Sequence, residues 1–137
     1  MHLVVISRRI KNLIDNYRSS KNVFGDELCA CCRSPMTGYY RDGYCKTEEG
    51  DFGAHVVCAQ VNFEFLEFTK SKGNDLSTPL PEYNFPGLRP GDSWCLCALR
   101  FKQAIESGIF LPINLDATHI RTLETFSLEE LREYQVN

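Results

Sequence analysis

The sequence predicts a single α+β domain with a small sheet, three to four helices and a long ordered loop at residues 73–93. The chain has 137 residues, which is the usual length of one domain and is enough to bury a core without cross-links. Hydrophobic residues make up 43% of the chain and charged residues 24%, as in ordinary globular proteins. Short apolar runs alternate with segments that carry helix-start and helix-stop residues, so we expect both strands and helices.

The first 21 residues predict an appended, basic amphipathic helix, and residues 22–137 form the single cysteine-rich domain. Apolar residues recur at helical spacing from Leu3 to Tyr17. Residues 1–21 carry five Lys or Arg and one acidic residue (+4), whereas residues 22–137 carry ten basic and seventeen acidic residues (−7). The acidic body argues against nucleic-acid binding, which needs a basic surface.

The first half of the domain predicts turns, then a strand and a helix. Residues 22–51 are rich in turn-forming residues, although Tyr39 and Tyr40 suit a short strand. Residues 54–61 are apolar and β-branched, which indicates a buried strand or a short buried helix. Asn62 then offers an N-cap for a helix over residues 63–72, which Gly73 would end.

The second half begins with the proline-rich loop at 73–93, whose aromatic residues predict that it is ordered and packed on the domain. Residues 98–107 predict a helix. Residues 113–115 alternate in polarity as a short strand does. Residues 127–130 match a capping box, so a last helix should run from there to about Tyr134.

The cellular setting follows from what the sequence lacks. It has no run of eighteen apolar residues that could span a membrane, and the apolar residues 3–6 are too few for a signal-peptide core. We therefore expect a cytoplasmic protein with no membrane partner. Disulfides are rare in that compartment, and clustered cysteines there more often serve metal binding or catalysis. An odd number of cysteines also argues against a pure disulfide framework.

The cysteines are the strongest candidates for chemistry. There are seven, and five of them fall in two tight groups: Cys29, Cys31 and Cys32, then Cys95 and Cys97. On an extended backbone the residues of a Cys-x-Cys pair face the same side, so each pair can offer two sulfurs to one zinc ion. The familiar Cys-x-x-Cys spacing is absent, and metal ligands, redox thiols and inert core thiols all remain open.

Two histidines and one carboxylate could assist a thiol or a metal. His55 shares a face with Cys58 only if that segment is helical, and on a strand it is better explained as a core histidine. Cys97 precedes a predicted helix, whose N-terminus would favour a thiolate. Asp75 and His119 are candidate bases, although Asp75 also suits a loop that caps itself through turn hydrogen bonds.

Long, unusual motifs run through the domain and resemble domain of unknown function 2237, a family of small bacterial and plant proteins. The resemblance covers about residues 22–134, and its motifs include residues 22–25, 35–43, 73–79, 85–88, 90–92, 94–98 and 117–119. It implies one cytosolic-type domain but no established activity. The positions that match the family pattern are Cys31, Cys45, Cys58, Cys95, Cys97, His55 and His119. Cys29 and Cys32 are additions, and Tyr44 stands where the family tends to have a cysteine.

Three functions are consistent with these residues. The leading hypothesis is a metal-binding protein, with zinc favoured, whose ligands are Cys31, Cys45, Cys58, Cys95, Cys97 and His55. If that metal has an open position, His119 or Asp75 would serve as the base. The second is a thiol-dependent enzyme or redox protein that uses Cys97 or Cys95. The third is a binding module whose loop aromatics form a groove for an unknown small molecule or protein; a homodimer is also left open.

Overall fold

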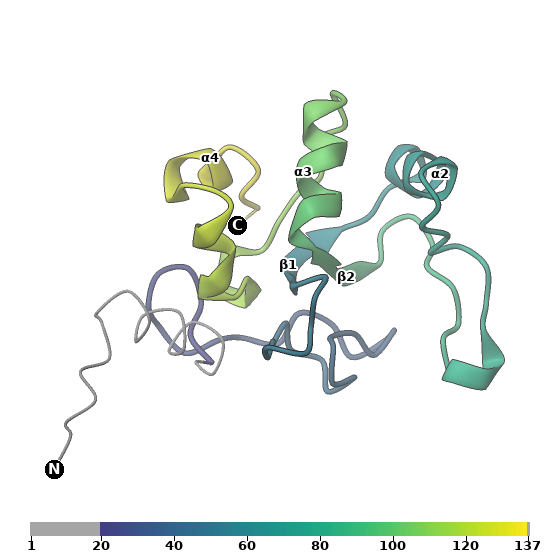
Figure 1. Ribbon diagram of the computed structural model, residues 1–137, viewed down its shortest axis with the longest axis horizontal. Coiled ribbons are helices and arrows are strands. Elements are labelled where there is room, and N and C mark those ends of the chain that lie inside the picture. Colours follow the sequence, from purple (N-terminus) through teal and green to yellow (C-terminus); the bar gives the residue numbers. More distant parts are fainter. Residues whose placement is uncertain (1–19, 137) are drawn as a thin grey trace, which may run out of the picture.

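The computed structural model describes residues 20–136 and has the α+β class that the sequence predicts (Figure 1). The predicted N-terminal helix lies outside these residues. Two antiparallel strands, β1 (His55–Gln60) and β2 (Ser93–Cys97), form the sheet. The α-helices are α2 (Phe63–Ser71), α3 (Ala98–Glu106) and α4 (Leu128–Arg132). Three short 3-10 turns complete the regular structure at Pro81–Tyr83, Leu115–Ala117 and Ile120–Glu124.

The sheet separates two unequal clusters of buried side chains. Successive residues of a strand point to opposite sides of the sheet. In the antiparallel pairing, Val57 lies opposite Leu96 and Cys58 lies opposite Cys95. Val57 and Leu96 belong to the main apolar core, which the helices cover. Cys58 and Cys95 belong to a second, smaller cluster. Figure 1 shows the helices above the sheet and the segment of residues 20–52 below it.

The helices begin where their sequence signals predict. The Asn62 side chain accepts a hydrogen bond from the Phe65 amide at the start of α2, and Gly73 follows this helix with a φ of +91°. Ser127 and Glu130 make the reciprocal hydrogen bonds of a capping box at the start of α4. Side-chain caps of this kind satisfy amides that lack a partner within the helix.

Two predicted strands, at residues 39–40 and 113–115, are absent from the described residues. Both predictions are wrong because the chain turns there. Tyr39 and Tyr40 lie in a turn, closed by a hydrogen bond from the Arg41 amide to the Gly38 carbonyl. Ile113 makes only single bridges, to Ala59 and Gln135, before the chain turns at Leu115–Ala117. Strand β2, by contrast, was not assigned from the sequence.

The loop at residues 73–93 is ordered and packed, as predicted. The Leu88 amide donates to the Leu76 carbonyl, and Leu80 and Phe85 pair their backbones on either side of the Pro81–Tyr83 turn. Phe85 and Leu88 are buried in the main core. Among residues 20–136, no helix is long and apolar enough to cross a bilayer.

Candidate functional site

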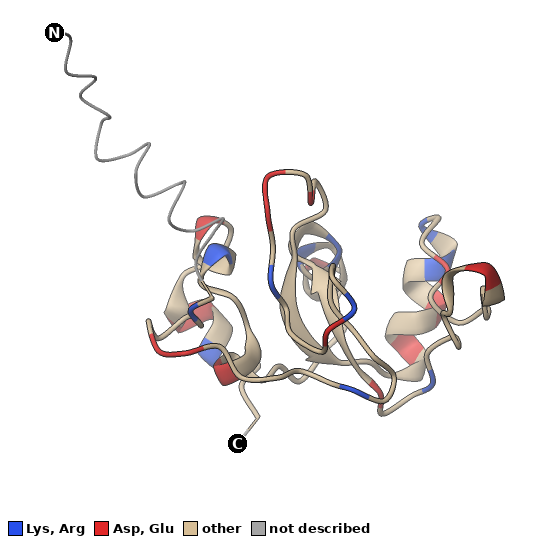
Figure 2. Cartoon of the chain, turned by 90° about the horizontal axis from the view of Figure 1, so that it is seen from below, with Lys and Arg blue, Asp and Glu red and all other residues tan. Residues whose placement is uncertain are grey.

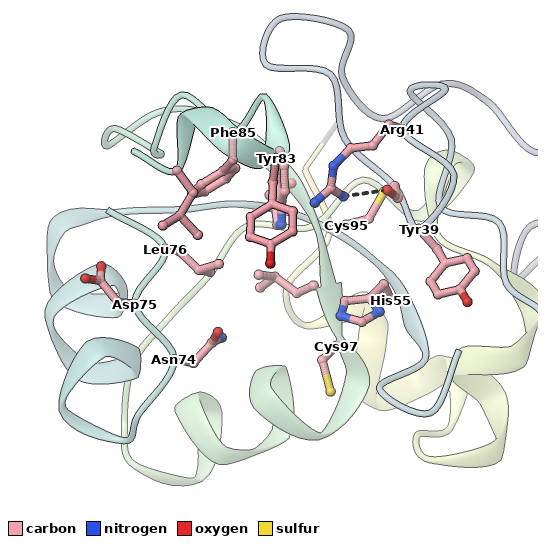
Figure 3. Close-up of a pocket in the computed structure, with 14 residues that line it drawn as sticks. Tyr39, Arg41, His55, Asn74, Asp75, Leu76, Tyr83, Phe85, Cys95 and Cys97 are labelled. Carbon is pink, nitrogen blue, oxygen red and sulfur yellow. Dashed lines mark hydrogen bonds between the residues drawn. The ribbon is translucent and has the colours of Figure 1, made fainter. Parts of the chain in front are cut away.

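A pocket of about 420 Å³ opens between the sheet, the loop at 73–93 and the turn that contains Arg41 (Figure 3). Its lining includes His55 from β1, Cys97 from the end of β2, and Tyr83 and Phe85 from the loop. Its volume suits a small molecule, and apolar walls with a few polar groups are typical of ligand sites. A pocket without a thiol would favour the binding-module hypothesis, but the free thiol Cys97 lines this one, together with the disulfide-bonded Cys95.

His55 is held by a buried carboxylate. Its Nδ1 lies 2.6 Å from Asp51 Oδ1, and its backbone amide donates to Asp51 Oδ2 at 3.0 Å. Asp51 is only 1% exposed, and its Oδ2 also accepts from the Thr47 hydroxyl, which in turn accepts from Arg121. Because an ionised carboxylate can only accept hydrogen bonds, Nδ1 is the donor to it, and in the neutral imidazole Nε2 is then the nitrogen that can accept a proton.

The backbone conformation just before His55 leaves space for the imidazole ring. A Cβ atom on Gly53 would lie 2.7 Å from His55 Cε1, so this position has room only for glycine unless the imidazole moves. Ala54 adopts a φ of +48°, which is unfavourable for a residue with a Cβ. A register shift between His55 and Val57 also bends β1 at this point. Together these features turn the strand end so that His55 reaches the pocket.

Cys97 stands where β2 passes into α3. It is the N-cap residue of α3, its side chain makes no capping hydrogen bond, and it is a free, partly exposed thiol. It is also the register partner of His55 across the sheet. The α3 N-terminus, with amides that lack intrahelical partners, favours a negative charge there. No hydrogen bond joins Cys97 to His55 within the described residues, and Figure 3 shows the Cys97 sulfur turned away from the imidazole.

Four other cysteines form two adjacent disulfides. Cys31 is bonded to Cys58 and Cys45 to Cys95, with Cα–Cα distances of 5.6 and 5.3 Å. Because Cys58 and Cys95 are register partners, the sheet brings the two bridges together. The sulfurs of Cys31, Cys45 and Cys58 all lie within 4.8 Å of one another.

The sequence expectation that disulfides are disfavoured is therefore corrected. It rested on an expected compartment and an odd cysteine count, whereas pairing depends on which loops the sheet brings into contact. Four of the six predicted metal ligands meet in these bridges. The other two, His55 and Cys97, line the pocket instead. Cys29 and Cys32, identified as additions, are free thiols outside the bridges.

The two predicted bases occupy different settings. Asp75 lines the pocket, but its carboxylate accepts hydrogen bonds from the Thr78 hydroxyl and from the Ser77 and Thr78 amides. These bonds hold the pKa of Asp75 below its ordinary value, so this group is a poor base. His119 is fully buried at the start of the Ile120–Glu124 turn, where its Nδ1 accepts from the Arg121 amide, and it does not line the pocket.

Sequence reasoning missed two residues that shape the site, Asp51 and Arg41. Asp51 lies four residues before His55, and this Asp-x-x-x-His spacing could have indicated that the two side chains are in contact. Arg41 was treated only as part of a turn. Its guanidinium lies 5.1 Å from the centre of the Trp94 ring, which lines the same pocket. No local pattern could have placed Arg41 beside Trp94, because 53 residues separate them (94 − 41).

Comparison with known proteins agrees with the resemblance in the motifs. A family model described as an uncharacterised protein conserved in bacteria (DUF2237) matches residues 21–135. We found no match to this chain among curated proteins. The matched residues include both disulfides and every residue of the pocket. The chain belongs to the DUF2237 family.

Proposed function

We propose that the protein is a thiol-dependent enzyme whose nucleophile is Cys97. The observation that carries this proposal is the position of Cys97 at the start of α3, in a pocket that His55 also lines while the buried Asp51 holds the His55 ring from behind. A nucleophile, a base and a group that orients the base are the parts of a cysteine–histidine catalytic site.

The residues can be assigned steps of an acyl transfer. His55 Nε2 takes the proton from the Cys97 thiol, and the thiolate attacks a carbonyl carbon of the substrate. The Ala98 amide donates to the Ala54 carbonyl, so we assign the stabilisation of the negative oxygen that forms to the next amides of the first α3 turn. The leaving group departs with the proton from His55, and water then hydrolyses the thioester and restores the thiol. The Cys97 sulfur must rotate toward His55 for the first step, and such contacts often tighten only when substrate binds.

Unfavourable backbone conformations near the pocket support the same proposal. Three residues other than glycine have positive φ angles within the described chain: Arg41, Ala54 and Asn84. Arg41 lines the pocket, Ala54 precedes His55, and Asn84 lies between Tyr83 and Phe85. Asparagine tolerates this conformation, but arginine and alanine do so at a cost. Costly backbone conformations persist mainly where function requires a particular geometry.

The rate of alkylation by iodoacetamide tests the nucleophile, with each modified cysteine identified by mass spectrometry. Cys29 and Cys32 are built-in controls, since they are free thiols away from the pocket and Cys29 is the more exposed. We expect Cys97 to react at least about tenfold faster than Cys29 near neutral pH, because a thiolate and not a thiol is the nucleophile. The substitution His55→Ala should remove this advantage.

Equal rates at Cys97 and Cys29 would overturn the proposal, because accessibility alone favours Cys29. A Cys97 rate that is high but unaffected by His55→Ala would leave a reactive thiol and remove His55 from the mechanism. The variant Cys97→Ser lacks the thiol in question, so it gives the alkylation rate of the other free cysteines alone.

A second candidate function is zinc binding by Cys31, Cys45, Cys58 and Cys95 in their reduced form. Zinc–sulfur bonds of about 2.3 Å place the sulfurs of a tetrahedral site roughly 3.8 Å apart. The 4.8 Å limit on the separations among Cys31, Cys45 and Cys58 is close to that spacing, and Cys95 joins them as the partner of Cys45. The same sulfurs cannot be both disulfides and ligands. A cytoplasmic location would keep the four thiols reduced and available to zinc.

Elemental analysis of the reduced protein, purified without a histidine tag, tests this candidate. We expect about one zinc per chain after reduction under anaerobic conditions, and little in the oxidised protein or in Cys45→Ser. The variant Cys97→Ser should still bind zinc, because Cys97 lies outside the cluster. A zinc content below about a tenth per chain in the reduced wild type would exclude the site.

A further inference from the structure

We infer that the pocket binds a small carboxylate with an apolar or aromatic body, and that Arg41 is the residue that recognises the carboxylate. The inference rests on the proposed function for the identity of the reacting group, Cys97, but the binding itself does not require catalysis. It names the class of substrate that would be presented to Cys97.

Arg41 is a cation without a carboxylate partner in the described part of the chain. The ion pairs found there involve other residues, and Asp42, its neighbour, pairs with Lys46 instead. Arg41 Nη1 donates to the Gly38 carbonyl at 2.7 Å, and the guanidinium lies over the Trp94 ring. These two contacts fix the orientation of the guanidinium and leave most of its five N–H donors for a ligand.

The backbone holds Arg41 in this place. Its φ of +54° is unfavourable for a side chain with a Cβ, whereas most arginines on a surface have no such constraint. Gly38, at the start of the same turn, has a φ of +100°, and a Cβ there would overlap the Tyr44 carbonyl oxygen. The turn is therefore built to aim Arg41 into the pocket, as Figure 3 shows.

Aromatic rings supply the wall for the rest of the ligand. Phe85 and Trp94 meet edge to face with ring centres 5.3 Å apart, and both are largely buried. Tyr83, by contrast, is 70% exposed, and Figure 3 shows its ring standing over the pocket. An aromatic surface that is open to solvent on one side is suited to cover a flat or apolar group.

The charges around the pocket favour one orientation of the ligand. The Asp75 carboxylate lies on the opposite side of the pocket from Arg41 in Figure 3, and its hydrogen bonds to Ser77 and Thr78 keep it charged. A ligand with one negative group would therefore place it at Arg41. We choose a carboxylate over a phosphate because a single planar guanidinium matches a carboxylate in two parallel hydrogen bonds, and no other Lys or Arg among the described residues lines the pocket.

Calorimetric titration of the full chain carrying Cys97→Ser tests the inference without any covalent reaction. The probes are 3-phenylpropionate, its neutral amide and phenyl phosphate. We expect the carboxylate to bind at least about tenfold more tightly than the amide, in line with the strength of charge-assisted hydrogen bonds. Arg41→Gln should abolish this preference. Arg33→Gln is the matched control, because Arg33 lies over the Tyr44 ring as Arg41 lies over the Trp94 ring, but Arg33 is outside the pocket.

The inference is overturned if no probe binds, if the acid and amide bind equally, or if Arg41→Gln binds like Arg33→Gln. Tighter binding of phenyl phosphate would also overturn the carboxylate assignment. Binding that depends on Arg41, found together with an unreactive Cys97, would uphold this inference and defeat the proposed function. A reactive Cys97 with no carboxylate preference would defeat this inference and uphold the proposed function.

Discussion

Single residues decide the geometry of the candidate site, and Asp51 has the largest part. It is buried, it accepts hydrogen bonds from the His55 ring, the His55 amide and Thr47, and it thereby fixes which nitrogen of His55 is basic. A carboxylate that orients a histidine in this manner contributes through the position and tautomer of the ring. The role we assign to Asp51 is thus one of positioning.

Gly53→Ala should disturb this arrangement without disturbing the fold. Its new Cβ would lie 2.7 Å from His55 Cε1, so the imidazole must shift from the position in which it contacts Asp51. We expect Cys97 to lose most of its alkylation advantage and the His55 Nδ1 proton signal in NMR spectra to shift or broaden. Gly50→Ala is the control, since its nearest neighbour is the flexible Glu48 side chain at 3.3 Å. Unchanged spectra and rates in Gly53→Ala would show that the ring position is not what matters.

At the scale of elements, local signals predicted the helices well and the strands poorly. Asn62 and the capping box at Ser127 mark helix starts because their side chains bond to amides only three residues away. Such signals need no tertiary context. The short strand expected at Tyr39 and Tyr40 is a turn, and β2 was overlooked, because a strand is stabilised by a partner that may be distant in sequence.

The start of α2 offers a measurable test at this scale. Asn62 caps the helix through the Phe65 amide and also donates to the Phe110 carbonyl, which joins α2 to the segment after α3. We expect Asn62→Ala to lower the free energy of unfolding by about 1–2 kcal/mol. The measurement is urea denaturation, with the exposed mid-helix variant Glu67→Ala as the control. A loss no larger than that of the control would mean that the cap contributes nothing.

At the scale of the whole molecule, the two disulfides attach the segment of residues 20–52 to the sheet. They link positions 31 to 58 and 45 to 95, so the two closed loops overlap in sequence. That segment has turns and single bridges but no helix or strand of its own within the described residues. Within residues 20–136, Lys and Arg are interspersed with Asp and Glu along the chain (Figure 2).

Removing one bridge should therefore destabilise the oxidised protein. We expect the double variant Cys45→Ala and Cys95→Ala to lose about 2–5 kcal/mol of unfolding free energy, chiefly because the unfolded chain gains freedom. Cys29→Ala with Cys32→Ala is a matched control that removes two free thiols. Urea denaturation without reductant measures both. Equal stability of the two double variants would contradict a structural role for the Cys45–Cys95 bridge.

By itself, the sequence determined the α+β class, the family, most helix boundaries and the set of reactive residue types. These depend on composition, on long motifs and on contacts between residues close in sequence. Only the tertiary structure decided how those residues combine. The antiparallel register places Cys58 beside Cys95, where the two disulfides meet, and His55 beside Cys97, where both side chains line the pocket. Register is a relation between strands more than thirty residues apart, and it depends on the packing of both faces of the sheet.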